Sequence, residues 1–277
     1  MKNTIFTGMA TAIVTPMHTD GSIDYEALGR FVEFQIGSGI NGLVVMGTTG
    51  ENATIEPEDQ KKVIAYTVEK VAGRVPVIAG TGTNNTEHVL HNTRNACQVG
   101  ADAILVVTPY YNKATQNGLV THFTAVADES TLPVILYNVP SRTGCNLLPK
   151  TVAKLSEHPN IAAIKEATGS LAQMIEIMHL CGDKIDVYSG EDGLTVPMMA
   201  NGILSGAILS WVAIVTELSS SIILYNNKSI TLTMSTYVAI SRGNYGLAAA
   251  FAAILTVVTT VSLLIYLAVS KSEDVSL

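Results

Sequence analysis

The chain has 277 residues, of which 14% are charged, and a formal net charge of −7 at pH 7. This length suits one large α/β barrel or two ordinary domains, and an acidic chain without a basic run argues against a nucleic-acid partner. The chain has three cysteines, Cys97, Cys145 and Cys181. They do not have the spacing of metal ligands, and their odd number does not suit a disulfide framework, so we expect reduced thiols in a cytosolic protein. The first residues lack the continuous apolar core of a signal peptide.

Charge is distributed unevenly along the chain. Residues 203–277 contain only six charged side chains, two lysines, one arginine, two glutamates and one aspartate, and all six histidines lie before them. The sequence therefore predicts two chemically different parts, residues 1–202 and residues 203–277.

In residues 1–202, short apolar runs alternate with amphipathic stretches of helical periodicity. The predicted strands are residues 11–14, 42–46, 75–79, 103–107, 134–137, 161–165 and 186–188, and the predicted helices are 25–36, 57–71, 86–98, 116–127, 148–155 and 171–180. The apolar runs are continuous rather than alternating, as in strands that are covered on both faces. Successive βα units predict a (β/α)₈ TIM barrel that is truncated after about seven units. A doubly wound sheet is disfavoured, because no GxGxxG follows the first strand.

In a barrel of this kind, the chemistry lies where the strands end and the βα loops begin. Lys165 stands at the end of the sixth predicted strand, where desolvation favours the neutral, nucleophilic amine. Such an amine forms a Schiff base with a carbonyl substrate. The alternative is that Lys165 extends into solvent as the first residue of a loop. Other reactive groups at the strand ends favour the first interpretation, and they lie in GTTGE (47–51), TPYYN (108–112), YNVPSRTG (137–144) and SGED (189–192).

These other candidates also have ordinary structural explanations. The GTTG turn (residues 47–50) is either a turn with capping hydroxyls or an anion nest for a small carboxylate. Tyr137 either fills the barrel or transfers protons beside Lys165. The tyrosine pair at 110–111 includes at least one surface or interface aromatic, and Arg142 is either a solvated arginine or a planar fork for a second carboxylate.

Taken together, these motifs resemble those of the dihydrodipicolinate synthase (4-hydroxy-tetrahydrodipicolinate synthase) family. Its members are class I, pyruvate-dependent aldolase-type lyases of lysine and diaminopimelate biosynthesis. The resemblance runs from about residue 6 to about residue 202, and it is carried by AIVTPM (12–17), GTTGE (47–51), VIAGTG (77–82), VTPYYN (107–112), LYNVPSRTG (136–144), IKEATG (164–169) and YSGED (188–192). The combination of LYNVPSRTG with IKEATG is the most specific part.

The resemblance implies roles for the residues that match the family's motifs. Lys165 would form the imine with pyruvate, and Thr49, with its turn, would hold the pyruvate carboxylate. Tyr137 would relay protons and be linked through Thr48 to Tyr111. Tyr111 would reach the site of a neighbouring subunit in a homodimer or homotetramer.

The second substrate implied by the resemblance is L-aspartate 4-semialdehyde. Arg142 would bind its carboxylate, the Gly190 backbone would line the pocket, and Ile208 would contribute from a run that imitates an eighth strand. No metal or nucleotide cofactor is implied. Relatives of this fold act on sialic acids or keto-deoxy sugar acids through the same imine, but Arg142 within SRTG favours the semialdehyde carboxylate over a polyol chain.

After Gly202 the resemblance ends in a hydrophobic, helical tail. Residues 202–225 contain one charge and residues 246–269 contain none, and each segment is long enough to cross a hydrocarbon core of ~30 Å at ~1.5 Å per residue. We therefore expect two transmembrane helices. The tail resembles the C-terminal membrane segments of binding-protein-dependent ABC transporter permeases, which implies a cytoplasmic catalytic domain associated with a membrane.

A barrel without its eighth strand has two open edges. This predicts that the catalytic groups are present but that the enzyme is weakened. The competing interpretation is an inactive fusion, or a membrane-transport fragment whose synthase part is inert.

Overall fold

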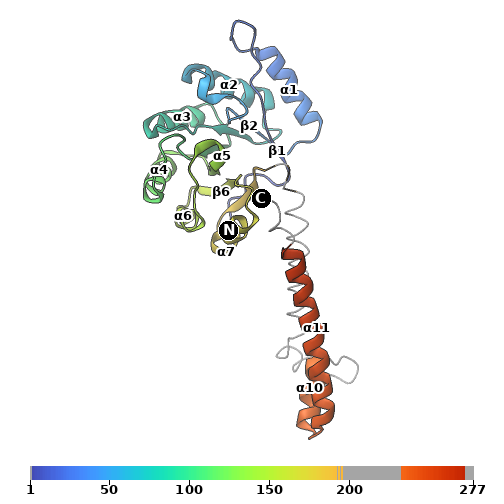
Figure 1. Ribbon diagram of the computed structural model, residues 1–277. Helices are drawn as coiled ribbons and strands as arrows, with labels where there is room; N and C mark the ends of the chain where they lie inside the picture. The colour runs from blue at the N-terminus through green and yellow to red at the C-terminus, as the bar shows by residue number, and fades with distance from the viewer. Residues whose placement is uncertain (1, 192, 194, 196–231, 272–277) are drawn as a thin grey trace. The chain divides into compact units, whose positions relative to one another are not determined.

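The computed structural model describes residues 2–191, 193, 195 and 232–271. The chain divides into two compact units, Met1–Asp192 and Gly193–Leu277. In the first unit, seven parallel strands pair in chain order from β1 to β7 and form one curled sheet (Figure 1). The outer helices follow the sheet in the same order, as a chain of right-handed βα units requires.

The strands are β1 (Ala10–Ala12), β2 (Gly42–Val45), β3 (Val77–Gly80), β4 (Ala103–Val107), β5 (Val134–Asn138), β6 (Ile161–Glu166) and β7 (Asp186–Ser189). The helices are α1 (Tyr25–Gly37), α2 (Pro57–Val71), α3 (Thr86–Gln98), α4 (Gln116–Glu129), α5 (Pro140–Thr143), α6 (Pro149–Leu155) and α7 (Leu171–Cys181), with a 3₁₀ turn, η1, at Asn52–Thr54. The seven predicted strands and six predicted helices are confirmed, with small shifts at their ends. The short elements η1 and α5 were not predicted from the sequence.

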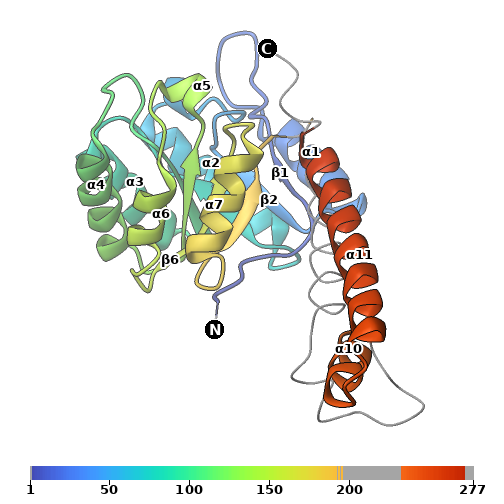
Figure 2. The same ribbon diagram turned by 60° about the horizontal axis from the view of Figure 1, so that its bottom comes forward.

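Alternate side chains of the strands pack on opposite faces of the sheet. Leu43 and Val45 of β2 belong to a large cluster that also contains helix residues such as Val63 of α2. Val44, between them, belongs to a second cluster formed almost entirely by strand residues. Figure 2 shows the helices along the outer face of the sheet, so the second cluster fills its inner, concave side. Both faces are therefore covered, which explains why the strands are continuously apolar.

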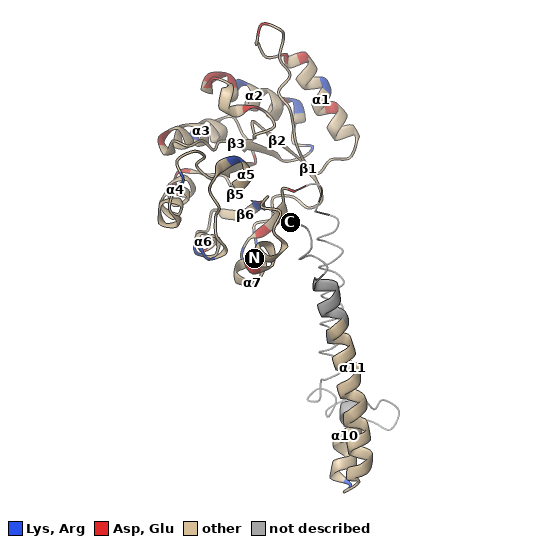
Figure 3. Ribbon diagram, viewed as in Figure 1, with Lys and Arg blue, Asp and Glu red and all other residues tan. Residues whose placement is uncertain are grey.

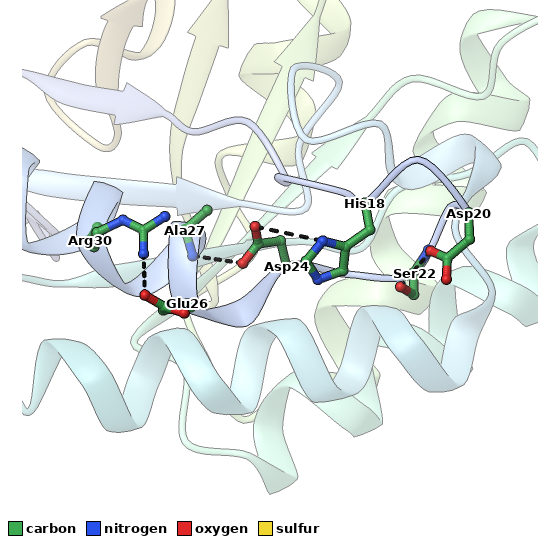
Figure 4. A network of polar contacts seen from close by, with 7 residues as sticks. All are labelled: His18, Asp20, Ser22, Asp24, Glu26, Ala27 and Arg30. Atoms are coloured by element: carbon green, nitrogen blue, oxygen red, sulfur yellow. Dashed lines mark hydrogen bonds and ion pairs between the residues drawn. The ribbon is translucent and has the colours of Figure 1, made fainter.

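Polar contacts fix the loop that follows β1 (Figure 4). The Asp24 carboxylate accepts a hydrogen bond from Ala27 N at 2.8 Å and so caps the first turn of α1, and it lies 3.9 Å from His18 Nδ1. Asp20 accepts hydrogen bonds from the Ser22 hydroxyl and backbone N–H, and these bonds lower the pKa of its carboxyl group. The loop at the end of the first strand is thus ordered by its own side chains.

Within the described residues, β1 and β7 form the two edges of the sheet. The segment before β1 bonds to the last strand: the Tyr188 hydroxyl donates to Phe6 O at 3.0 Å, and the two rings stack at 4.3 Å. Lys2 also pairs with Asp186 at 3.2 Å. The beginning of the chain therefore ties the two ends of the sheet together, which reduces the exposure of the open edges that the sequence predicted.

In the second unit, α10 (Leu232–Ser241) and α11 (Tyr245–Lys271) contact each other. Gly243 takes a φ of 71°, and the Asn244 side chain accepts from Leu247 N at 3.1 Å, so the turn ends one helix and caps the next. Both helices are almost free of charged residues (Figure 3).

Only α11, among the described residues, is long and apolar enough to cross a membrane; its window Tyr245–Ser262 has a mean hydropathy of 1.8 and is 6% buried. This helix contains the whole of the predicted span 246–269. The other predicted span, 202–225, and the candidate substrate contact Ile208 lie outside the described residues.

Candidate active site

A cavity of about 190 Å³ opens at the carboxyl ends of the central strands. Three residues predicted from the sequence share its wall: Thr48 from the turn after β2, Tyr137 from β5 and Arg142 from α5. The remaining lining residues are Gly47, Asn52, Ala53, Gly80, Gly82, Leu105, Val107, Tyr110, Val139 and Thr143. The cavity therefore lies where barrel chemistry is expected.

Lys165 and Tyr137 lie side by side at this end of the sheet. They are register partners on β6 and β5, so both side chains project from the same face. Lys165 Nζ lies 4.6 Å from the centroid of the Tyr137 ring, and Tyr137 is only 7% exposed. The amine thus lies on the face of a buried ring whose hydroxyl is a group able to transfer protons.

Gly190 lies against the stem of this lysine. A Cβ built on Gly190 would stand 2.8 Å from Lys165 Cε and 2.8 Å from the Ala167 side chain. Gly190 N also donates to Glu166 O at 2.7 Å, which holds its backbone beside the end of β6. A side chain at position 190 would therefore displace the amine, and the bare backbone leaves room for it.

The GTTG turn after β2 is closed by its own backbone. Gly50 N donates to Gly47 O at 3.0 Å, and Glu51 N donates to Thr48 O at 3.1 Å. The buried Thr15 hydroxyl donates to Gly50 O at 2.8 Å and ties the turn to the segment after β1. Thr48 and Thr49 are exposed at its tip, so both hydroxyls are accessible to a small anion.

Two glycines of β3 and its following loop allow neighbouring strands to approach closely. A Cβ on Gly80 would lie 2.0 Å from Met46 O, and a Cβ on Gly82 would lie 2.4 Å from Val107 N. No role for these glycines was predicted, although VIAGTG carries both of them within three residues at the end of a strand. They keep one wall of the cavity free of side chains.

Arg142 and Tyr111 lie on the outer side of the site. Arg142 is in the last turn of α5 and exposed, and it reaches the cavity wall. Tyr111 is 87% exposed with a φ of 72°, and its N–H donates to Thr143 O at 3.3 Å. An exposed tyrosine is accessible to a neighbouring subunit, but its contact with one stays a prediction.

No group of three or more His, Cys, Asp or Glu side chains could hold a metal ion in the part of the chain that the structure describes. Cys97, Cys145 and Cys181 are free thiols. Burial raises the pKa of Cys145 and of Cys181, so both are held as thiols rather than reactive thiolates.

Proteins of one family match this chain in sequence. The model of the dihydrodipicolinate synthetase family matches residues 5–235. The 4-hydroxy-tetrahydrodipicolinate synthase of Geotalea uraniireducens is 58% identical over 198 residues, which are 72% of this chain and 68% of that protein.

Two solved structures show how far the likeness extends. The chloride-inhibited dihydrodipicolinate synthase of Acinetobacter baumannii, solved with pyruvate, is 45% identical with a TM-score of 0.69, and the match covers 71% of this chain and 67% of that one. The dihydrodipicolinate synthase of Aquifex aeolicus is 37% identical with a TM-score of 0.68 over 92% of this chain and 82% of that one. Both matches confirm the TIM-barrel-like fold.

The family match also bears on the tail. It continues to residue 235, beyond the point near Gly202 at which the sequence analysis ended the resemblance. The comparisons do not support the resemblance of residues 203–277 to an ABC transporter permease.

Proposed function

The chain belongs to the dihydrodipicolinate synthetase family, and from that premise we propose that it condenses pyruvate with L-aspartate 4-semialdehyde to form 4-hydroxy-tetrahydrodipicolinate. It would act as a class I aldolase-type lyase of lysine and diaminopimelate biosynthesis. One observation carries the proposal: Lys165 Nζ lies over the Tyr137 ring, 4.6 Å from its centroid, at the carboxyl end of the sheet. A nucleophilic amine beside a proton donor is what imine formation requires.

The reaction begins when the neutral Lys165 amine adds to the keto carbon of pyruvate. The Tyr137 hydroxyl passes protons as the carbinolamine loses water and becomes the imine. Loss of a methyl proton gives the enamine, whose carbon attacks the aldehyde of the second substrate. The amino group of that substrate then closes the ring at the imine carbon and releases Lys165. The covalent imine itself acts as the electron sink, so the family's chemistry uses neither a metal nor a nucleotide.

Two cavity features would hold the substrates' carboxylates. The GTTG turn offers the exposed hydroxyls of Thr48 and Thr49 to the pyruvate carboxylate. Arg142 offers a planar fork to the carboxylate of the semialdehyde. Tyr111, exposed on the same rim, would complete the proton relay of a second subunit in a homodimer or homotetramer.

A substrate panel tests the reaction. The purified full chain is incubated with pyruvate and either L-aspartate 4-semialdehyde or the aldehyde partners of sialic-acid and keto-deoxy sugar acid lyases, and pyruvate consumption is followed. We expect turnover with the semialdehyde and loss of that turnover in Lys165→Met. Turnover with a sugar aldehyde alone would favour the sugar-acid lyase alternative, and no turnover with any aldehyde would favour the inactive fusion.

We further propose that α11 associates with a membrane while the first unit works in the cytoplasm. Large apolar side chains along this helix are exposed, among them Ile254, Val257 and Val261. A core helix of the same length would bury them, whereas a helix in lipid leaves them on its surface. Its uncharged stretch up to Lys271 spans roughly 40 Å at ~1.5 Å per residue.

Cell fractionation tests this second proposal. We expect the full chain in the pellet, resistant to alkaline carbonate and extracted by detergent. Val257→Arg, in the middle of the helix, should release it, whereas Tyr245→Arg, at the helix end, should not. A wild-type chain found in the supernatant would refute the membrane proposal and leave the proposed reaction untouched.

A further inference from the structure

Behind the Lys165–Tyr137 pair lies a second, buried pair of polar residues. Glu166 follows Lys165 on β6, Asn138 follows Tyr137 on β5, and these two are again register partners. Glu166 is 2% exposed and Asn138 is 0% exposed. Because successive strand residues point to opposite faces, their side chains project toward the helices and away from the cavity.

The Glu166 carboxylate accepts hydrogen bonds from three neighbours. Oε2 accepts from Asn138 Nδ2 at 3.0 Å and from Gln173 Nε2 of α7 at 3.2 Å. Oε1 accepts from Thr168 N at 2.8 Å. A buried carboxylate is tolerated only where such donors replace water, so the arrangement depends on all of them.

Asn138 extends the same network to the segment between α5 and α6. Its Oδ1 accepts from Leu147 N at 2.9 Å, and its Nδ2 also donates to Asn146 Oδ1 at 2.9 Å. Gln173 exchanges hydrogen bonds with the Asn146 amide. Two strands, one helix and one loop are therefore joined through a single set of side chains.

The backbone of the network reaches the groups that surround the amine. Ala167 N donates to Asn138 O at 2.9 Å, and Gly190 N donates to Glu166 O at 2.7 Å. A side chain at position 190 would contact both Ala167 and Lys165. A rotation of the end of β6 at Glu166 would therefore move the backbone of Gly190, which lies against the Lys165 side chain.

We propose that Glu166, Asn138 and Gln173 form a clamp that positions Lys165 and Tyr137 for imine formation. The clamp touches no substrate; it fixes the ends of β5 and β6 from which the two reacting side chains project. The expected effect of the clamp on catalysis rests on the proposed function. Displacements near 1 Å at a reacting centre reduce rates by about a hundredfold, so a clamp of this kind has a measurable effect on chemistry.

Glu166→Gln is the sharpest single change, because it keeps the shape of the side chain and replaces one acceptor oxygen with an NH₂ donor. That donor faces either Thr168 N–H or the amides of Asn138 and Gln173, which all donate. Asn138→Asp places a second carboxylate against Glu166 instead. The double variant, Asn138→Asp with Glu166→Gln, restores one donor and one acceptor in the reverse direction.

Asp102→Asn is the matched control. The Asp102 carboxylate accepts from Val77 N at 2.8 Å, at the opposite, amino-terminal end of the sheet. Asp102→Asn makes the same carboxylate-to-amide change as Glu166→Gln. It weakens one hydrogen bond from a backbone N–H, and Asp102 lies away from the site. If the clamp variants fail to fold, Gln173→Met on the partly exposed face of α7 removes one donor to Glu166 more gently.

The test measures borohydride trapping of labelled pyruvate by the folded full chain, with amide hydrogen exchange at Ala167 and Gly190. We expect Glu166→Gln and Asn138→Asp to slow trapping by about tenfold to a hundredfold, the double variant to recover part of the rate, and Asp102→Asn to match the wild type. The pyruvate concentration that gives half of the maximal trapping rate should change much less than the maximal rate itself. A purely structural role would lower the melting temperature of the variants without changing trapping per folded molecule.

The outcomes separate the two proposals. Wild-type trapping rates in folded Glu166→Gln or Gln173→Met would overturn the clamp. A wild-type chain that traps no pyruvate would overturn the proposed function, and hydrogen exchange would then decide the clamp alone. Faster exchange at Ala167 and Gly190 in Glu166→Gln, but not in Asp102→Asn, supports it, and unchanged exchange refutes it.

Discussion

Lys165 Nζ lies 4.6 Å from the centroid of the Tyr137 ring, and the two residues are register partners on adjacent parallel strands. The distance follows from the strand register, because directly paired residues project from the same face of the sheet. The face of the ring covers one side of the amine, and the hydroxyl is carried on the same rigid group. The contact therefore brings the amine and a phenol hydroxyl together at the carboxyl end of the sheet.

Tyr137→Phe keeps the ring under Lys165 and removes only the hydroxyl. We expect kcat to fall by about 10²-fold or more, the usual contribution of a positioned acid–base group, with little change in the KM for pyruvate. Steady-state kinetics measures both. Tyr66→Phe, in the aromatic pair between α1 and α2, serves as the control. A Tyr137→Phe enzyme with unchanged kcat would remove the phenol from the proton relay.

Arg142→Ala removes the fork that is proposed to bind the second substrate. We expect the KM for L-aspartate 4-semialdehyde to rise by about tenfold to a hundredfold, equivalent to a charge-assisted hydrogen bond of ~1.5–3 kcal/mol, while pyruvate trapping stays normal. Arg94→Ala, which only breaks the half-exposed pair with Glu129, is the control. Loss of pyruvate trapping in Arg142→Ala would assign the arginine to the first substrate instead.

Gly80→Ala tests the close approach of β3 to the GTTG turn. The new Cβ would lie 2.0 Å from Met46 O, and the backbone has to shift, so we expect a loss of ~1–3 kcal/mol in unfolding free energy together with weaker pyruvate binding. Urea denaturation and the KM for pyruvate report the two effects. At Gly37, the last residue of α1, a Cβ meets nothing within 4 Å, so Gly37→Ala should not lower the unfolding free energy and should leave the KM for pyruvate unchanged. Equal stability of the two variants would contradict this account of the strand contact.

His122 predicts a dependence of stability on pH. Burial lowers its pKa from 6.5 to about 4, and its Nδ1 lies 2.9 Å from the Thr86 hydroxyl. As pH falls from 6.5 to about 4, the unfolded chain binds a proton that the folded chain does not bind. The free energy of unfolding therefore decreases as pH falls through this window. The total decrease, from above pH 6.5 to below the pKa of the folded state, is ~3 kcal/mol.

Urea denaturation of wild type and His122→Asn at pH 7.5, 6, 5 and 4.5 isolates this contribution. We expect the difference in unfolding free energy between them to shrink as pH falls, because only the wild type carries the buried imidazole. His179→Asn, exposed on α7, is the control. A difference that stays constant across this range would show that His122 titrates alike in both states.

Much of the first unit could be predicted from the sequence, because each strand is a continuous apolar run and each helix is amphipathic. The approach of Lys165 to Tyr137 could also be predicted: both end strands in a barrel whose carboxyl ends meet at one rim. The short helix α5, which carries Arg142, begins at Pro140 and is capped by Gly144, and it was not predicted from the sequence.

The features that escaped prediction depend on contacts between distant residues. No local pattern shows that Gly80 faces Met46 O, or that Glu166 and Asn138 find their partners in Gln173 and Leu147. A glutamate directly after a lysine is ambiguous in sequence, because the register of the strand decides which of the two side chains lies on the face that carries Tyr137. In the tail, the apolar composition correctly predicted the long helix α11, while the comparisons place the residues up to 235 within the family match.

The measurement that tests the account most directly is borohydride reduction of the full chain in the presence of pyruvate, followed by peptide mapping. The imine mechanism predicts one stable adduct per chain, on the peptide that contains Lys165, and no adduct in Lys165→Arg. An unlabelled chain, or a label on another lysine, would contradict the assignment of Lys165 as the nucleophile.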